Sequence, residues 1–228
     1  MGARLIAEDL ALLLQSPETG RPVVGSQELA PALAGALLLE LALRERVQVE
    51  DGGRWGGDKL RAVPGPATGD DLLDEALGKL PAERSTGARG AVQKIADRRL
   101  AGRVHERLAA AGLARRTPGA FLKLGRTHPD VATRKELLAS VVAALEAPDA
   151  SAAQQRPAAL VSLLHAVGAV TKVVPAEGAG RKDLKRRAKA LSEGEWAGAA
   201  VLAAVRAAQS GAAAAAAAAS GAAVAAAS

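Results

Sequence analysis

The sequence predicts a mainly α-helical protein: a single globular domain with a buried central helix bundle, ringed by amphipathic helices and carrying short β-hairpins. Hydrophobic residues make up 49% of the 228, yet aromatic residues only 1%. A core of Leu, Val and Ala favours helix on helix over an all-β fold. The most apolar run, residues 33–43, is Leu and Ala interrupted only by Gly35 and Glu40. A helix that is apolar on every side must be surrounded by other helices.

The first helix is expected over Leu5–Leu14, with apolar residues at helical spacing and with Glu8 and Asp9 on the opposite side. Pro17 and Gly20 end it. The next helix starts near residue 27, with Pro31 as a candidate break, and leads into the central run.

After the central run, Arg46–Glu50 and Lys59–Val63 are expected to pair as a hairpin around a glycine-rich turn that carries Trp55. Asp70 is the expected N-cap of the next helix. Acidic residues in the first turn of that helix interact favourably with the positive end of the helix dipole.

A long basic helix is predicted over Ala91–Ala111, stopping at Gly112. Leu113–Leu124 then reads as a β-hairpin around Pro118-Gly119.

Further helices are expected over residues 135–145, headed by Asp130 and Thr133, and over residues 157–174, interrupted near Gly168. Two more are expected over residues 182–191 and 195–209. The domain is taken as residues 1–210. Residues 211–228 form an Ala-rich tail, which we expect to be disordered because alanine alone buries little surface.

Several classes of protein find no support in the sequence. It has no cysteine, nucleophile elbow, phosphate loop or GxGxxG motif, and from its patterns we expect neither a signal peptide nor a bilayer-spanning apolar run. His105, His128 and His165 lie on three separate segments without metal-ligand spacing; we expect His128 to cap a turn and His165 to lie in or near the core. We therefore expect no enzyme activity, catalytic residue, metal site or cofactor.

The net charge of +6 favours a polyanionic partner, either anionic lipid or nucleic acid. Arg99, Arg103 and Arg107 share a helix face at i, i+4 spacing and, with Arg98, are candidates to hold an anionic headgroup. The alternative is a solvated face. For a second basic cluster, residues 181–189, the solvated face is the preferred interpretation because Asp183 lies within it.

The predicted hairpin carries three apolar residues, Phe121, Leu122 and Leu124. If the hairpin protrudes, they are available for a second subunit or for a lipid surface. The alternative is that they pack back onto the core.

Two stretches carry a family resemblance. Leu39 to Arg44, followed by Arg46 to Val49, resembles the central-helix signature of the Golgi phosphoprotein 3 family. Thr68-Gly69-Asp70, followed by Leu72 to Leu77, is similar to its second signature. Phe121-Leu122 and Thr127-His128-Pro129 resemble the family's hairpin and the turn after it. Order and spacing agree from about Leu5 to Gln209.

The resemblance implies a helical domain with a protruding hairpin, and a cytoplasmic, peripherally membrane-associated adaptor. Eukaryotic members bind phosphatidylinositol 4-phosphate in a pocket of one tryptophan and several arginines, and hold cytoplasmic tails of membrane proteins. Their hairpin mediates oligomerisation and membrane contact. Pocket positions correspond here to Gly25, Ala34, Arg98 and Ala101, with Arg103 at a further basic position. We expect a bacterial member.

The leading hypothesis is thus an anionic-lipid-binding adaptor or scaffold that uses Arg98, Arg99 and Arg103 for the headgroup and the hairpin for membrane contact or homo-oligomerisation. Two alternatives remain. One is a winged-helix-like nucleic-acid-binding module, disfavoured by the large Leu/Ala bundle. The other is a structural oligomer without a lipid ligand.

Overall fold

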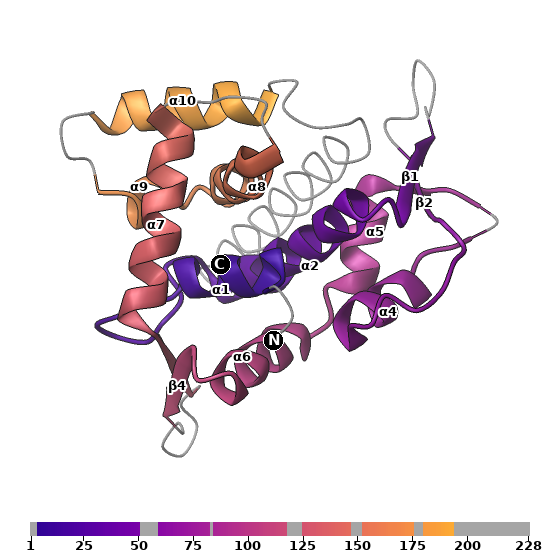
Figure 1. Ribbon diagram of the computed structural model, residues 1–228, viewed down its shortest axis with the longest axis horizontal. Coiled ribbons are helices and arrows are strands. Elements are labelled where there is room, and N and C mark those ends of the chain that lie inside the picture. The colour runs from indigo at the N-terminus through magenta and orange to yellow at the C-terminus, as the bar shows by residue number, and fades with distance from the viewer. Residues whose placement is uncertain are drawn as a thin grey trace, which may run out of the picture.

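The computed structural model describes residues 4–50, 59–82, 84–117, 125–146, 152–175 and 180–193. Helices dominate these residues and gather around α2 (Ser26–Leu43), while the short strands lie at the margins (Figure 1). The mainly α-helical fold predicted from composition is confirmed.

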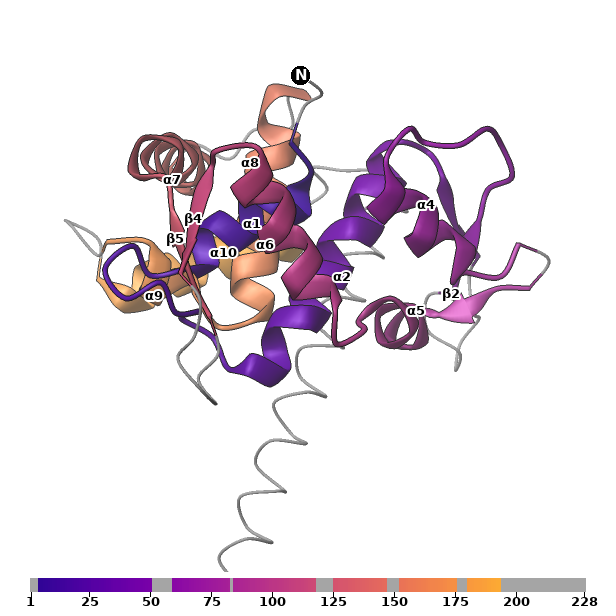
Figure 2. The same cartoon turned by 90° about the horizontal axis from the view of Figure 1, so that it is seen from below.

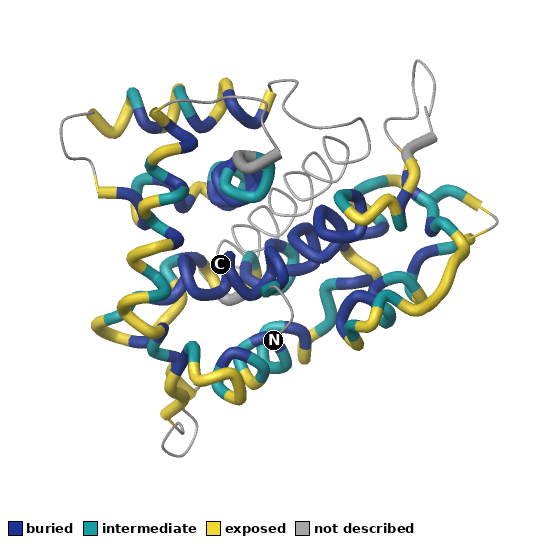
Figure 3. The backbone as a smooth tube through the Cα atoms, in the orientation of Figure 1, coloured by how far each residue is buried: buried dark blue, intermediate teal, exposed yellow. Residues whose placement is uncertain are grey.

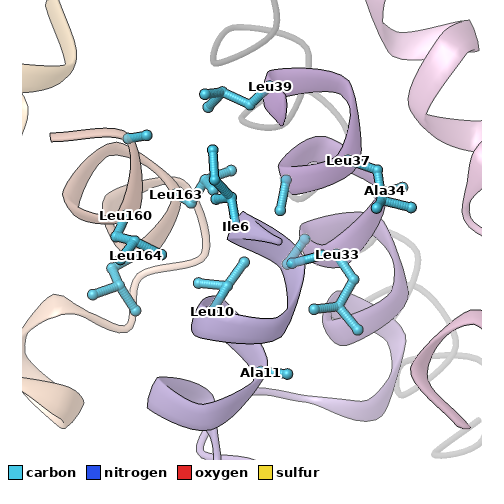
Figure 4. Packing of buried hydrophobic residues seen from close by; sticks show 14 of the residues in the cluster. Ile6, Leu10, Ala11, Leu33, Ala34, Leu37, Leu39, Leu160, Leu163 and Leu164 are labelled. Carbon is cyan, nitrogen blue, oxygen red and sulfur yellow. The ribbon is translucent and has the colours of Figure 1, made fainter. Parts of the chain in front are cut away.

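Helix α2 forms the centre of the core. All of its residues from Ala32 to Ala42 are buried, so no face of this stretch meets water. Helix α1 (Ile6–Leu14) packs along it, and α8 (Ala152–Ala166) adds a third layer, with Leu163 and Leu164 of α8 on the side of Ile6 and Leu10 (Figure 4). Pro31 lies inside α2 and does not break it, contrary to the expected interruption. The packing of neighbouring helices around α2 stabilises it by more than the loss of one backbone hydrogen bond at the proline costs.

The carboxylates of the inner helices are buried and paired, which corrects the expectation that Glu8 and Asp9 face away from the core. They are only 7% and 6% exposed, and Glu40 of α2 is 4% exposed. Glu40 accepts a hydrogen bond from the backbone N–H of Ile6 at 2.9 Å and one from Arg156 of α8 at 3.1 Å. These bonds join α1, α2 and α8, and they satisfy a charge that would otherwise be costly to bury.

The predicted long helix over residues 91–111 is in fact two helices, α5 (Ala88–Ile95) and α6 (Leu100–Ala110). Asp97 causes the break, because its carboxylate accepts the backbone N–H of Arg99 at 2.7 Å and so competes with helical hydrogen bonding. Helix α4 (Asp71–Gly78) precedes them. Its N-cap is Asp70, as predicted, with Leu72 and Leu73 donating to the carboxylate.

Two small antiparallel sheets complete the fold. Strands β1 (Val47–Glu50) and β2 (Lys59–Ala62) pair as predicted, with Val47 opposite Ala62. A third strand, β3 (Thr86–Gly87), joins β2; it is two residues long and carries no sequence signal of its own. The second sheet consists of β4 (Ala114–Thr117) and β5 (Arg126–Pro129).

The C-terminal helices cover the other side of the core. They are α7 (Val131–Glu146), α9 (Val170–Val173) and α10 (Arg181–Glu193), and α10 packs across α8. The predicted interruption near Gly168 is confirmed, because Gly168 adopts φ +62° between α8 and α9. Helices α7 and α8 begin earlier than predicted.

The turn with Trp55, the expected helix over residues 195–209 and the tail lie outside the described residues. Among the residues that are described, no helix is both long and apolar enough to cross a membrane.

We expect Leu37→Ala to lower the free energy of unfolding by about 2–5 kcal/mol, because it leaves a cavity beside the fully packed α2. Val131→Ala is the matched control: this side chain is 71% exposed, and its truncation should change stability by less than about 0.5 kcal/mol. Urea unfolding followed by circular dichroism measures both. Equal effects would contradict the central position of α2.

Candidate functional site

The candidate site is the basic helix–hairpin unit, which we define as residues 96–129: the turn before α6, α6 itself, and strands β4 and β5. Gly112 ends α6 in the left-handed conformation at φ +72°, and the N–H of Leu113 closes the helix on the carbonyl of Leu108 at 2.9 Å. The chain then enters β4. Helix α6 and β4 lie together at the lower margin of the molecule in Figure 1.

A hairpin follows α6 as predicted, but its second arm differs. The prediction placed that arm before residue 125, whereas the structure pairs Thr117 with Arg126 and Ala114 with Pro129. Thr127, His128 and Pro129, taken as a turn after the hairpin, are therefore strand residues. The apolar residues Phe121, Leu122 and Leu124 fall outside the described residues.

The base of the hairpin is fixed to the turn that follows α1. The N–H of Thr127 donates to the carbonyl of Gly20 at 2.9 Å, and Nδ1–H of His128 donates to the carbonyl of Pro17 at 3.1 Å. A Cβ at Gly20 would come within 2.7 Å of the His128 ring, and Gly20 also has φ +63°. Only glycine allows this close approach of the two segments.

Arg103 is held by acidic residues on both sides of α6. Its guanidinium forms a bidentate pair with Glu75 of α4 and contacts Asp97 at 3.3 Å. Lys79 bridges the same two carboxylates, at 2.7 Å and 2.8 Å. The hydrogen bond to Glu75 raises the pKa of Arg103, and the hydrogen bonds from Arg103 and then Lys79 lower the pKa of Glu75. This network ties α6 to α4.

Arg107 is held in a similar way, one turn further along α6. It forms a bidentate pair with Asp70, at 2.9 Å and 2.6 Å, and reaches Glu8 of α1 at 3.1 Å. Burial would raise the pKa of Asp70, but the hydrogen bond and charge of Arg107 outweigh that effect and lower it. Asp70 therefore caps α4 and anchors α6 through one carboxylate, whose Oδ1 accepts from both the α4 backbone and Arg107.

Four arginines of the unit remain exposed without an acidic partner among the described residues. They lie just before α6 and on the hairpin: Arg98, Arg99, Arg115 and Arg126. Arg116 is also exposed but pairs with Glu106 at 3.0 Å. Of the three candidate headgroup residues, the structure thus leaves Arg98 and Arg99 open and engages Arg103.

Sequence reasoning missed Arg126 and Val131 as members of this surface. Val131 begins α7 directly beyond β5, and its hydrophobic side chain is 71% exposed. Together with Arg115, it lines a shallow hollow between the hairpin and α7. The only sequence signal for this exposed residue is a single valine directly after Asp130, at the expected start of a helix.

The histidines contribute no metal site. Within the described part of the chain, no group of three His, Asp or Glu side chains is arranged to hold a metal. The amide of Gln15 lies 3.1 Å from Nε2 of His105 and donates to it in the neutral form of the ring. Burial lowers the pKa of His105 to about 4, and the charge of Arg116 acts in the same direction. His165 lies on α8 and is half-buried, as expected.

The pocket positions inferred from the resemblance do not form a cationic pocket here. Ala34 is completely buried in α2 (Figure 4). Gly25 is the exposed N-cap of that helix, and Ala101 is in the first turn of α6. An arginine at position 34 would place a charge among leucines and alanines, so this position supports packing and not ligand binding.

A comparison with protein families found that residues 6–208 match the family described as Golgi phosphoprotein 3 (GPP34). The match covers both signature stretches, the whole helix–hairpin unit and α10. A search of curated proteins found no match.

Asp70→Ala should destabilise the fold by about 2 kcal/mol, since it removes both the α4 cap and the bidentate partner of Arg107. Asp71→Ala is the control, because Asp71 is exposed and contributes only through the helix dipole, less than about 1 kcal/mol. Chemical unfolding of both variants measures the difference, and equal losses would show that the shared carboxylate is unimportant.

His105 should make stability depend on pH. Its folded-state pKa of about 4 lies below the value near 6.5 of the unfolded chain, so the unfolded state binds the proton more readily. The His105 contribution is complete above pH 6.5 and is lost as the pH falls towards 4. Between pH 7.5 and 5 the loss is about 2 kcal/mol.

The measurement is urea unfolding at both pH values for the wild type and for His105→Gln. Glutamine retains a hydrogen-bonding group opposite Gln15 but does not titrate. The variant should show a pH dependence smaller by the amount given above. An identical dependence in the two proteins would contradict a neutral, buried His105.

Proposed function

Because the chain belongs to the Golgi phosphoprotein 3 family, we propose that it is a peripheral membrane adaptor or scaffold that binds anionic, phosphoinositide-like headgroups through the basic helix–hairpin unit. The observation that carries the proposal is the set of four exposed arginines just before α6 and on the hairpin, which have no acidic partner in the part of the chain that the structure describes. Family membership fits an adaptor role, which needs no catalytic group.

The arginines divide into two functions. Arg98 and Arg99 precede α6 and are free to contact a headgroup, while Arg115 and Arg126 do so from the hairpin. Arg103 would first have to leave Glu75 and Asp97, so we assign it to bracing α6 rather than to direct contact. Each cation near an anionic bilayer contributes about 1 kcal/mol, and four of them give reversible attachment. Val131 adds an apolar contact beside the hairpin.

A flat anionic surface suits this unit better than a nucleic-acid groove. The solvent-exposed residues of α6 are Glu106 and Ala110, and a carboxylate in that position repels phosphate. Arg103 and Arg107, which a recognition helix would use, are turned towards α4 and α1. We therefore place the membrane at the ends of α6, with cytoplasmic tails of membrane proteins as the partners of the adaptor and the hairpin as a candidate self-association surface.

Liposome co-sedimentation tests the proposal. The wild type should bind vesicles that contain an anionic lipid at low salt, and should not bind phosphatidylcholine vesicles. Arg98→Glu/Arg99→Glu and Arg115→Glu/Arg126→Glu should each weaken binding by at least about 30-fold, because each removes two attractive charges of about 1 kcal/mol and adds two repulsive ones. Vesicles with phosphatidylinositol 4-phosphate and vesicles with phosphatidylserine, matched for total charge, show whether the protein distinguishes the two headgroups.

The control is Arg89→Glu/Lys94→Glu on α5, which makes the same change in net charge at two exposed residues outside the unit. It should leave vesicle binding within about threefold of the wild type. Absence of binding by the wild type, or an equal loss in the control, would overturn the proposed surface. Tight binding of random duplex DNA without vesicle binding would favour the nucleic-acid alternative.

A further inference from the structure

Helix α10 carries a second basic surface, which the proposed function does not use. Its buried side consists of Leu184, Ala188 and Leu191, packed against the bundle. Its outer side is basic and exposed, and we call it the α10 face: Arg181, Lys182, Lys185, Arg186 and Lys189. Their spacing at i, i+1, i+4, i+5 and i+8 places them along one stripe of the helix.

The acids of the helix neutralise only part of this charge. Asp183 pairs with Arg186 and, at 2.7 Å, with Arg187, while Glu193 approaches Lys189 at 3.9 Å. Arg181, Lys182 and Lys185 have no ion-pair partner within the described residues. These three side chains therefore form no ion pair there that would stabilise the fold, and their charge is available to an anionic partner.

The α10 face and the basic helix–hairpin unit lie on opposite sides of the molecule. In Figure 1, α10 runs along the top and α6 with β4 along the bottom, with α1, α2 and α8 between them. Seen from below in Figure 2, α6 and the hairpin are in front and α10 lies behind the core. In Figure 3 the exposed positions of α10 lie on the outer side of the helix and its buried positions on the side towards the bundle. One flat bilayer cannot touch both surfaces at once.

We propose that the α10 face binds a second anionic membrane surface, so that the protein bridges two bilayers; the bridging rests on the proposed function of the helix–hairpin unit. Clusters of four to eight Lys and Arg on a helix are typical of binding to anionic lipid. The apolar side of α10 is already buried in the domain. Contact is therefore electrostatic, without insertion, and is sensitive to salt.

The shape of α10 favours a bilayer over a peptide. The helix lies on the outside of the bundle and presents a convex stripe of charge. A hollow at the C-terminal end of this helix, beside His165, Ser192 and Glu193, includes only the last cation of the stripe, Lys189. A broad anionic plane can therefore meet all five cations of the convex stripe together.

Vesicle clustering tests the inference. Two populations of phosphatidylserine-containing vesicles, one with a fluorescence donor and one with an acceptor, are mixed with the full chain at low salt. The wild type should bring them together. Lys182→Glu/Lys185→Glu should reduce clustering at least tenfold while single-vesicle binding, measured by flotation at excess lipid, changes less than about threefold. Arg89→Glu/Lys94→Glu is the charge-matched control and should cluster like the wild type.

The outcomes separate the two proposals. If the wild type binds vesicles without clustering them, or if the α10 variant clusters them as well as the wild type, bridging through α10 is overturned and the helix–hairpin proposal stands. If Arg115→Glu/Arg126→Glu abolishes clustering but keeps α10-dependent binding, both surfaces are supported. If only duplex DNA binding responds to the α10 substitutions, the membrane assignment of this face is wrong.

Discussion

Helix α2 has no side that can be left in water, and the arrangement of the molecule follows from that requirement. Leu, Ala and one glycine fill its middle, so other helices must cover it all round. The one carboxylate in that stretch, Glu40, is accommodated because the N–H of Ile6 and the guanidinium of Arg156 converge on it. Covering α2 therefore also determines where charges can enter the core and which helices they join.

The same requirement explains why the arginines of α6 have different functions. Helix α6 lies against α1 and α2, and its middle arginines face acids on α4 and α1. Arg103 and Arg107 consequently belong to the fold. The ends of α6 and the hairpin project beyond these acids, which leaves Arg98, Arg99, Arg115 and Arg126 available. The candidate site thus consists of the arginines that are not paired with acids where α6 packs against α4 and α1.

Local chemistry was sufficient to predict some elements and insufficient for others. The central helix, the Asp70 cap and the stops at Gly112 and Gly168 depend on residues next to one another in sequence, and all were predicted. The break at Asp97, the buried state of Glu8 and the pairing of Arg103 depend on partners far along the chain or on competition between hydrogen bonds. Charge spacing in α6 predicted a common face but could not show that acids of α4 and α1 occupy it.

The attachment of β5 to the turn after α1 has a mechanical consequence. Thr127 and His128 bond to Gly20 and Pro17, immediately beyond the end of α1. A force applied to β5 is therefore carried through these two bonds to the end of α1, a helix whose residues are all buried in the core.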